Sequence, residues 1–280
     1  GGARSDFGSI GDLTAWIMID RQSLLAAGIV CATLAVCGVR GEEPERAPSE
    51  ELRLYLQGRY VYERQCLDCH GERGRGDGPW SEGLTSRPRN FRSGVFKFRT
   101  TPFGKLPVKA DLERTIRAGI SGTAMPTFTN LGNQDLEAVI YYITRLSRAW
   151  KDESLRAEPV QLPTTLPDWF AHQEEKEKHV ERGSALFGAS CALCHGEGGH
   201  GDGPAAGGLV DFWGHVVSPA ALSAEHHKGG DSPFDLYRTI ATGLNGTPMR
   251  GYADILGKEQ IWDLVAWIES IEGTAPGEPN

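Results

Sequence analysis

The stretch Cys66-Leu67-Asp68-Cys69-His70-Gly71-Glu72 returns 125 residues later as Cys191-Ala192-Leu193-Cys194-His195-Gly196-Glu197. Each copy is followed at the same distance by Gly-Asp-Gly-Pro, which ends at Pro79 in the first copy and at Pro204 in the second. A second block matches at an offset of 124 residues and pairs the Gly-Thr-Ala-Met loop at 122–125 with the Gly-Thr-Pro-Met loop at 246–249. Two copies of one domain explain a repeat of this length better than convergence does.

Apolar residues recur at intervals of three and four near the end of each copy, a pattern that predicts an amphipathic helix. In each copy a helix precedes the repeated motif, a short helix precedes the Gly-Thr loop, and an amphipathic helix closes the domain. The expected ranges are 50–65, 110–118 and from about 133 in the first copy, and 176–190, 232–242 and from 258 in the second. The predicted fold is therefore all-α, with two tandem small helical domains at residues 50–150 and 176–273.

The composition of the 280 residues limits the classes of partner. A net charge of −8 and a pI near 5.5 argue against nucleic acid, because phosphate binding needs a basic face. The charge is uneven, since residues 50–150 carry 16 Lys and Arg against 11 Asp and Glu, whereas residues 178–273 carry 6 against 12. Either the two domains attract each other, or each docks a different partner, or the imbalance is that of an ordinary solvated surface.

The N-terminal region has the pattern of an export segment. No charge occurs in residues 22–39 and an acidic stretch follows, which predicts a signal peptide or membrane anchor over residues 18–40. Met18 is then the expected start, and residues 1–17 are an upstream extension. A lipid attached at Cys37 is a weaker alternative. We expect an exported, periplasmic protein that is soluble or anchored. Two linkers and a tail are expected at residues 41–49, 151–175 and 274–280.

Two cysteines separated by two residues and followed by histidine form the attachment signature of c-type haem. The thiols would bond to the two vinyl groups, and the histidine would ligate the iron. The expected attachment residues are Cys66, Cys69, Cys191 and Cys194, and the expected iron ligands are His70 and His195. Zinc is the alternative, although one zinc site would need four ligands brought together from both motifs. The other two cysteines lie in the export segment, so no disulfide framework is expected.

Only two of the three methionines, Met125 and Met249, lie outside the export segment. They follow the motif histidines by 55 and 54 residues, at equivalent positions of the two copies. A lone Met is usually a flexible filler of the core. Two at matched positions favour a role as axial ligands of two covalently attached haem c groups. A thioether ligand closes the iron to small molecules, so each haem would carry electrons rather than catalyse a reaction.

The two repeats resemble the class I c-type cytochromes of the bacterial mono- and dihaem type. The resemblance implies two tandem cytochrome c domains, in each of which the first and last helices cross at a glycine beside aromatic rings. The residues that fit this contact are Gly58, Tyr62 and Tyr142 in the first copy and Gly183, Phe187 and Trp267 in the second. The resemblance also implies a proline carbonyl that orients the ligating histidine, for which Pro79 and Pro204 are candidates.

One stretch breaks the repeat, because residues 87–99 have no clear counterpart in the second copy. Its cations would face a haem propionate or an acidic partner; they are Arg87, Arg89, Arg92, Lys97 and Arg99. The two haem surroundings are therefore expected to differ.

The expected function is one-electron transfer, by a shuttle or by the cytochrome subunit of a complex, with no catalytic residue. The partners would be redox proteins: a dehydrogenase, a quinol-oxidising complex, an oxidase or a reductase. A dihaem enzyme such as a peroxidase, or a haem-based sensor, is the alternative. A peroxidase needs an iron that can open, which paired methionines argue against, and a sensor needs a signalling domain that does not accompany the repeats.

Overall fold

The computed structural model describes residues 48–274, which belong to one compact unit. Over the described range the chain forms helices, turns and loops, and its β-type pairing is limited to a single bridge between Val210 and Val216. The all-α prediction is confirmed. No helix of this range is long and apolar enough to cross a membrane. The predicted segments 1–17 and 18–40, and most of the linker 41–49 and of the tail 274–280, lie outside the described residues.

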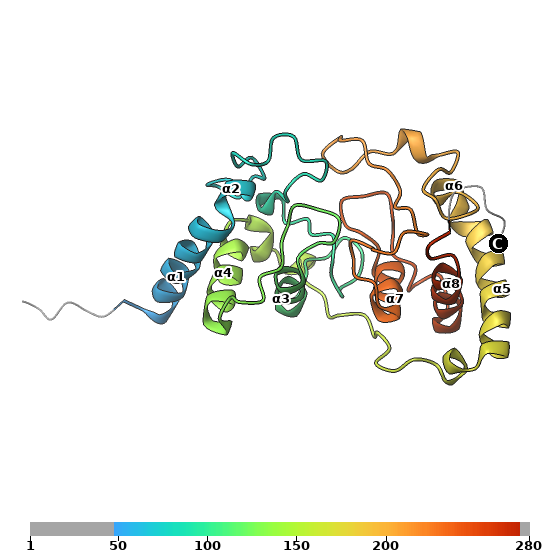
Figure 1. Ribbon diagram of the computed structural model, residues 1–280. Helices are drawn as coiled ribbons and strands as arrows, with labels where there is room; N and C mark the ends of the chain where they lie inside the picture. Colours follow the sequence, from blue (N-terminus) through green and yellow to red (C-terminus); the bar gives the residue numbers. More distant parts are fainter. Residues whose placement is uncertain (1–47, 275–280) are drawn as a thin grey trace, which may run out of the picture. The chain divides into compact units, whose positions relative to one another are not determined.

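Each repeat contributes four α-helices in the same order (Figure 1). In the first repeat these are α1 (Glu50–Gln65), α2 (Leu67–His70), α3 (Lys109–Ala118) and α4 (Asn133–Arg145). In the second repeat they are α5 (Gln173–Ser190), α6 (Ala192–His195), α7 (Pro233–Thr242) and α8 (Lys258–Ser270). The largest difference from the predicted ranges is at α5, which begins three residues before position 176. Its first turn carries Glu174 and Glu175, whose negative charges favour a helix N-terminus.

Local sequence sets where these helices begin and end. Ser49 caps α1 and Ser232 caps α7, each through a side-chain oxygen that accepts a backbone N–H of the first turn. Pro233 occupies the first turn of α7, where its missing N–H is not needed. Gly119 and Gly243 end α3 and α7 with φ of 66° and 68°, a conformation that favours glycine. The chain therefore turns sharply after each short helix, just before the Gly-Thr loop.

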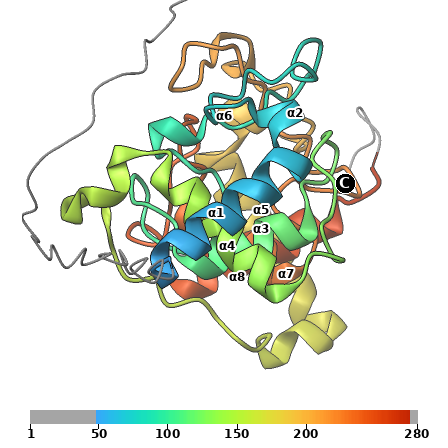
Figure 2. The ribbon, with the colours of Figure 1, turned by 90° about the vertical axis from the view of Figure 1, so that its left-hand side faces the viewer.

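The first and last helices of each repeat cross at a glycine. A Cβ atom added to Gly58 would lie 1.9 Å from the carbonyl oxygen of Ala138, and one added to Gly183 would lie 2.0 Å from that of Asp263. Figure 2 shows α1 lying across α4. Aromatic rings flank both crossings, with centroid distances of 5.1 Å and 3.9 Å for the pairs Tyr62–Tyr142 and Phe187–Trp267. The helix contact implied by the family resemblance is confirmed.

Each repeat has its own buried apolar core beneath its crossing. The core of the first repeat contains Val61, Tyr62, Phe91, Phe96, Leu112, Leu136, Val139, Ile140, Tyr142 and Ile143. That of the second contains Phe187, Leu236, Tyr237, Ile240, Ile261, Trp262, Leu264, Val265, Trp267, Ile268 and Ile271. These cores fix the helix that ends in the motif against the helix that closes the repeat, and so they hold the motif in place.

The segment 151–175, predicted to be a linker, is held to the repeats that it joins. The N–H of Leu106 donates to the carbonyl of Leu155, and the N–H of Val160 donates to that of Thr100, both at 2.8 Å. Further along, Phe170 packs edge-on against Trp262 of the second repeat. The segment therefore contacts both repeats, and it contains two short 3-10 helices, Glu153–Leu155 and Asp168–Ala171.

Candidate haem sites

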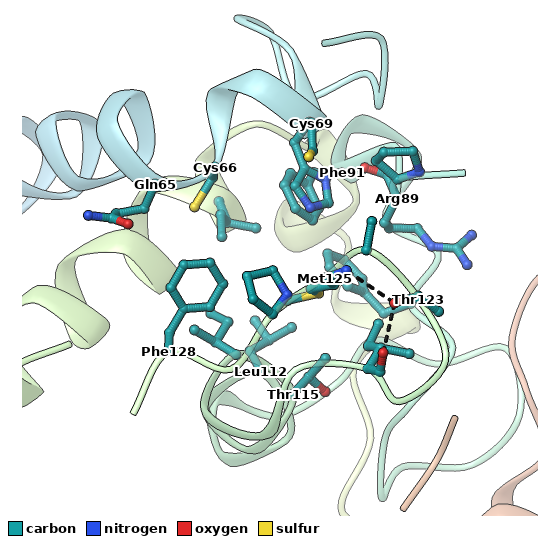
Figure 3. A pocket seen from close by; sticks show the side chains of 18 of the residues that line it. Gln65, Cys66, Cys69, Arg89, Phe91, Leu112, Thr115, Thr123, Met125 and Phe128 are labelled. Carbon is teal, nitrogen blue, oxygen red and sulfur yellow. Dashed lines mark hydrogen bonds between the residues drawn. The ribbon is translucent and has the colours of Figure 1, made fainter. Parts of the chain in front are cut away.

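An apolar cavity in the first repeat is bordered by both motif cysteines, the motif histidine and Met125 (Figure 3). Cys66 lies where α1 gives way to α2, and Cys69 and His70 lie within α2. Met125 lies on the loop that follows α3. The rest of the lining is mainly apolar and includes Leu112, Ile116, Phe128, Val139 and Ile143. Two thiols, an imidazole and a thioether around one apolar space suit a covalently attached haem.

The imidazole of His70 is fixed on its Nδ1 side. Nδ1 lies 3.0 Å from the carbonyl oxygen of Arg89, which can only accept, so Nδ1 carries the hydrogen. The ring also stacks on Phe91, with centroids 4.3 Å apart and planes 19° apart. Burial lowers the pKa of His70, which favours the neutral form that binds a metal. Nε2 is left as the nitrogen free to act as a ligand.

His195 of the second repeat is held in the same way. Its Nδ1 donates to the carbonyl oxygen of Ala220 at 3.0 Å, and burial lowers its pKa. The carbonyl of His195 accepts from Gly201 N–H at 2.7 Å, as that of His70 accepts from Gly76 at 2.8 Å. Both repeats therefore present the same oriented histidine after the two cysteines.

The structure corrects the two predicted second-sphere residues, Pro79 and Pro204. The acceptors are the carbonyls of Arg89 and Ala220, each of which directly follows a different proline. Around Pro79 the backbone is bonded back onto the motif helix, since Trp80 N–H donates to an α2 carbonyl at 2.8 Å. That turn therefore packs on the helix backbone, and a later segment of the chain reaches the imidazole.

A related correction concerns residues 87–99, which do have a partial counterpart. Phe91 N–H donates to Gly74 at 2.7 Å, and Leu222 N–H donates to Gly199 at 2.6 Å. Residues 88–91 therefore correspond to residues 219–222, at an offset of 131 rather than 125. The additional residues of the second repeat fall in the loop that contains the Val210–Val216 bridge. This insertion hides the match in the sequence.

Met125 and Met249 lie on loops with the same hydrogen bonds. The carbonyl of Met125 accepts from Ile120 N–H at 3.2 Å, and its own N–H donates to Thr123 Oγ1 at 3.2 Å. The Met249 loop repeats both bonds, at 2.9 and 3.2 Å. The Gly-Thr-X-Met sequence therefore adopts the same backbone conformation in both repeats, and in each the threonine side chain accepts a hydrogen bond from the methionine N–H.

Four cationic side chains border the cavity of the first repeat, and one of them belongs to the second repeat. They are Arg87, Arg89, Lys97 and Lys228. The pKa of Lys97 is lowered to about 8, chiefly because burial disfavours its charged form and also because Arg89 and Lys228 lie nearby. Sequence reasoning missed Lys228, since nothing in its local sequence links it to a motif so far away. A group with negative charge would be stabilised at this rim.

The zinc alternative finds no support in the structure. Nowhere in residues 48–274 do three or more His, Cys, Asp or Glu side chains converge to form a metal site. Within the described residues the two motifs therefore do not combine into one four-ligand centre.

Comparisons with known proteins agree with this geometry. The family model of cytochrome c matches residues 180–272, and that of subunit III of the cbb3-type cytochrome c oxidase matches residues 54–143. A comparison with curated proteins found no match. Among solved structures, a chain of the reducing HAO-like protein complex of Kuenenia stuttgartiensis is 34% identical, with a TM-score of 0.70. The match covers 77% of this chain and 96% of that one.

The chain belongs to the c-type cytochromes. A second solved structure, cytochrome CL of Methylophaga aminisulfidivorans, matches this cytochrome with 21% identity and a TM-score of 0.28, over 39% of this chain and 61% of that one. Such a score is too low to support a structural conclusion. The two cytochrome c domains bring two covalently bound haem c groups with iron. Electron transfer is the function of such domains, and it is the function of this cytochrome.

Proposed function

We propose that the domains at residues 50–150 and 176–273 each hold one haem c through the residues that the repeat predicts. Cys66 and Cys69, or Cys191 and Cys194, form the thioethers. His70 with Met125, and His195 with Met249, are the axial iron ligands. The bound haem supplies a reversible one-electron couple.

The observation that carries this proposal is the matched pair of hydrogen-bonded supports. In both repeats Nδ1 of the histidine donates to a backbone carbonyl at 3.0 Å, and a threonine hydroxyl 3.2 Å away accepts from the methionine N–H. A fixed imidazole tautomer and a fixed methionine loop are what two permanent ligands need. The cations around the first cavity are suited to the two carboxylates of a haem.

We propose further that the protein carries electrons and is not itself an enzyme. Two protein ligands would leave each iron no coordination position for a substrate, and the apolar lining of the first cavity would keep water away from the iron held there. Each domain would accept and release one electron without a proton-transfer residue at the site. A dihaem enzyme or a sensor would instead need one iron that opens.

Its partners are proposed to be redox proteins of an exported compartment such as the periplasm. The similarity to a chain of a reducing HAO-like protein complex supports a role as the cytochrome subunit of an oxidoreductase complex, and a free shuttle is the other form of the same role. A dehydrogenase, a quinol-oxidising complex, an oxidase or a reductase would supply or take the electrons.

The test is the far-red absorption of the ferric protein, recorded with the haem content of the same sample. We expect a methionine-sulfur-to-iron band that scales to two haems and is unchanged by peroxide, and a spectrum of the reduced protein that is unchanged by carbon monoxide. Met125→His and Met249→His should each remove half of it. A band that accounts for only one haem, or a high-spin iron that binds peroxide or carbon monoxide, would contradict this proposal and indicate a dihaem enzyme or a sensor.

A further inference from the structure

Arg99 of the first repeat is buried in contact with the second. It is 0% exposed, and its guanidinium donates to the carbonyl of Thr242 at 2.6 Å and to that of Gly243 at 3.0 Å. Two further bonds, each 3.2 Å, go to the carbonyls of Lys97 and Pro102. The hydroxyl of Thr242 lies 3.2 Å from the carbonyl oxygen of Arg99 and 2.9 Å from that of Arg238 in its own helix. A buried charge is tolerated here because its donors meet a set of carbonyl oxygens.

The two acceptors in the second repeat stand at the end of a helix. Thr242 is the last residue of α7, and Gly243 follows it with a φ of 68°. The last carbonyls of a helix lack partners within it and carry the negative end of the helix dipole. A cation is the favoured cap at this position, and here the other repeat supplies it. Arg99 therefore completes α7.

A second bridge holds the residues that come next. The side chain of Asn245, 4% exposed, accepts from Gly104 N–H at 2.7 Å and donates to the carbonyl of Lys105 at 2.9 Å. A Cβ added to the neighbouring Gly246 would lie 2.9 Å from Val95 of the first repeat. The stretch 242–246 is thus fixed against residues 95–105 by hydrogen bonds and by close packing.

This stretch leads directly into the loop of Met249. Leu244 lies between Gly243, which Arg99 contacts, and Asn245. Its N–H donates to the carbonyl of Met249 at 2.9 Å, so this stretch is hydrogen-bonded to the methionine itself. The first repeat has a different arrangement. There Arg117, from α3, donates to the carbonyls of Phe128, Thr129 and Leu131, all within its own repeat. One methionine loop is therefore supported from inside its repeat, and the other from across the repeat boundary.

We propose that Arg99, with Asn245, is a positioning residue for Met249, so that the first repeat secures axial ligation in the second. The inference rests on the proposed role of Met249 as an iron ligand. It assigns an asymmetry to the pair of haems: displacing residues 95–105 loosens one methionine and not the other.

The test follows the far-red band of the full dihaem ferric protein on heating. Met125→His and Met249→His assign the loss of the band to each methionine in turn. We expect Arg99→Gln and Asn245→Ala to lower the temperature at which the Met249 band is lost and to leave that of Met125 unchanged. Arg99→Lys should give an intermediate shift, since it keeps the charge and loses the forked donor. Arg117→Gln is the matched control and should shift the Met125 band alone.

The outcomes separate this inference from the proposed function. If the unsubstituted protein shows no band for Met249, the proposed ligand is wrong and the inference falls with it. If both bands are present and Asn245→Ala and Arg99→Lys leave the Met249 transition unchanged, or move both transitions equally, the inference alone is wrong. Asn245→Ala decides the matter if Arg99→Gln does not fold.

Discussion

The guanidinium of Arg89 lies over the indole of Trp213, with 4.6 Å from Cζ to the ring centroid. The two residues belong to different repeats, and the backbone carbonyl of Arg89 also accepts the hydrogen bond from His70. One residue thus orients the histidine of the first repeat through its backbone and contacts the second repeat through its side chain.

Arg89→Ala should separate these two roles. The substitution keeps the carbonyl that orients His70 and removes the contact with Trp213, so the free energy of unfolding should fall by about 1–2 kcal/mol with an unchanged ferrous haem spectrum. Denaturant unfolding of Arg89→Ala, Trp213→Ala and the double variant measures the coupling. Strictly additive losses would show that the contact contributes nothing.

The glycines of the helix crossings should be intolerant of a methyl group. Gly58→Ala and Gly183→Ala would place Cβ about 2 Å from a backbone oxygen of the facing helix, so we expect each to destabilise the protein by about 3 kcal/mol. Gly188, also in α5, meets nothing within 4 Å. Gly188→Ala should therefore stabilise by about 0.5–1 kcal/mol. Thermal unfolding of the three variants separates the effect of packing from that of helix propensity. Equal changes in stability at the crossing glycines and at Gly188 would contradict the close approach of the crossing helices.

Lys228 should influence the haem of the other repeat. Its ammonium borders the first cavity and donates to Ser86 at 3.0 Å. A positive charge near an iron favours the ferrous state, so Lys228→Gln should lower the reduction potential of one haem by about 10–40 mV, equivalent to about 0.2–1 kcal/mol. Spectroelectrochemical titration resolves the two haems. Lys258→Gln, at the start of α8, is the control. An equal shift in potential there would show that the effect comes from the net charge of the protein and not from the position of Lys228.

His227 should make part of the stability depend on pH. Burial lowers its pKa below 6.5, although Asp231 and Glu272 act in the opposite direction. The unfolded chain therefore binds a proton more readily, and this contribution to stability is lost as the pH falls below 6.5. His227→Gln should reduce the loss of unfolding free energy between pH 7 and 5. His172→Gln, at an exposed position, is the control. The same pH dependence of the unfolding free energy in both variants would contradict this role of His227.

Much of the fold could be read from the sequence because its signals are local. The α1 range is the predicted one, and Gly58 meets the last helix of its repeat as the family resemblance implied. The acceptors for the histidines were missed because a backbone carbonyl has no side-chain signature. Pro79 and Pro204 lie at equal distances from their motifs, whereas the actual acceptors follow loops of unequal length.

The basic stretch 87–99 shows the other limit of sequence reasoning. Its cations were grouped because they are neighbours in the chain, yet the structure sends them to different places. Three of them, Arg87, Arg89 and Lys97, border the cavity, and Arg89 also covers Trp213. Arg92 is exposed, and Arg99 enters the second repeat. The prediction that all of them face a propionate or an acidic partner is wrong for Arg99, whose donors meet backbone carbonyls. Only the fold decides which surface each side chain reaches.

The buried Arg99 also bears on the history of the duplication. Two copies of a domain begin as interchangeable modules, each able to function without its neighbour. Once a charged side chain of one copy closes a helix of the other, neither half can be exchanged, reordered or inherited separately without opening that contact. The two repeats are thus no longer interchangeable modules, because separating them would expose the charge of Arg99 and leave the last carbonyls of α7 without this partner.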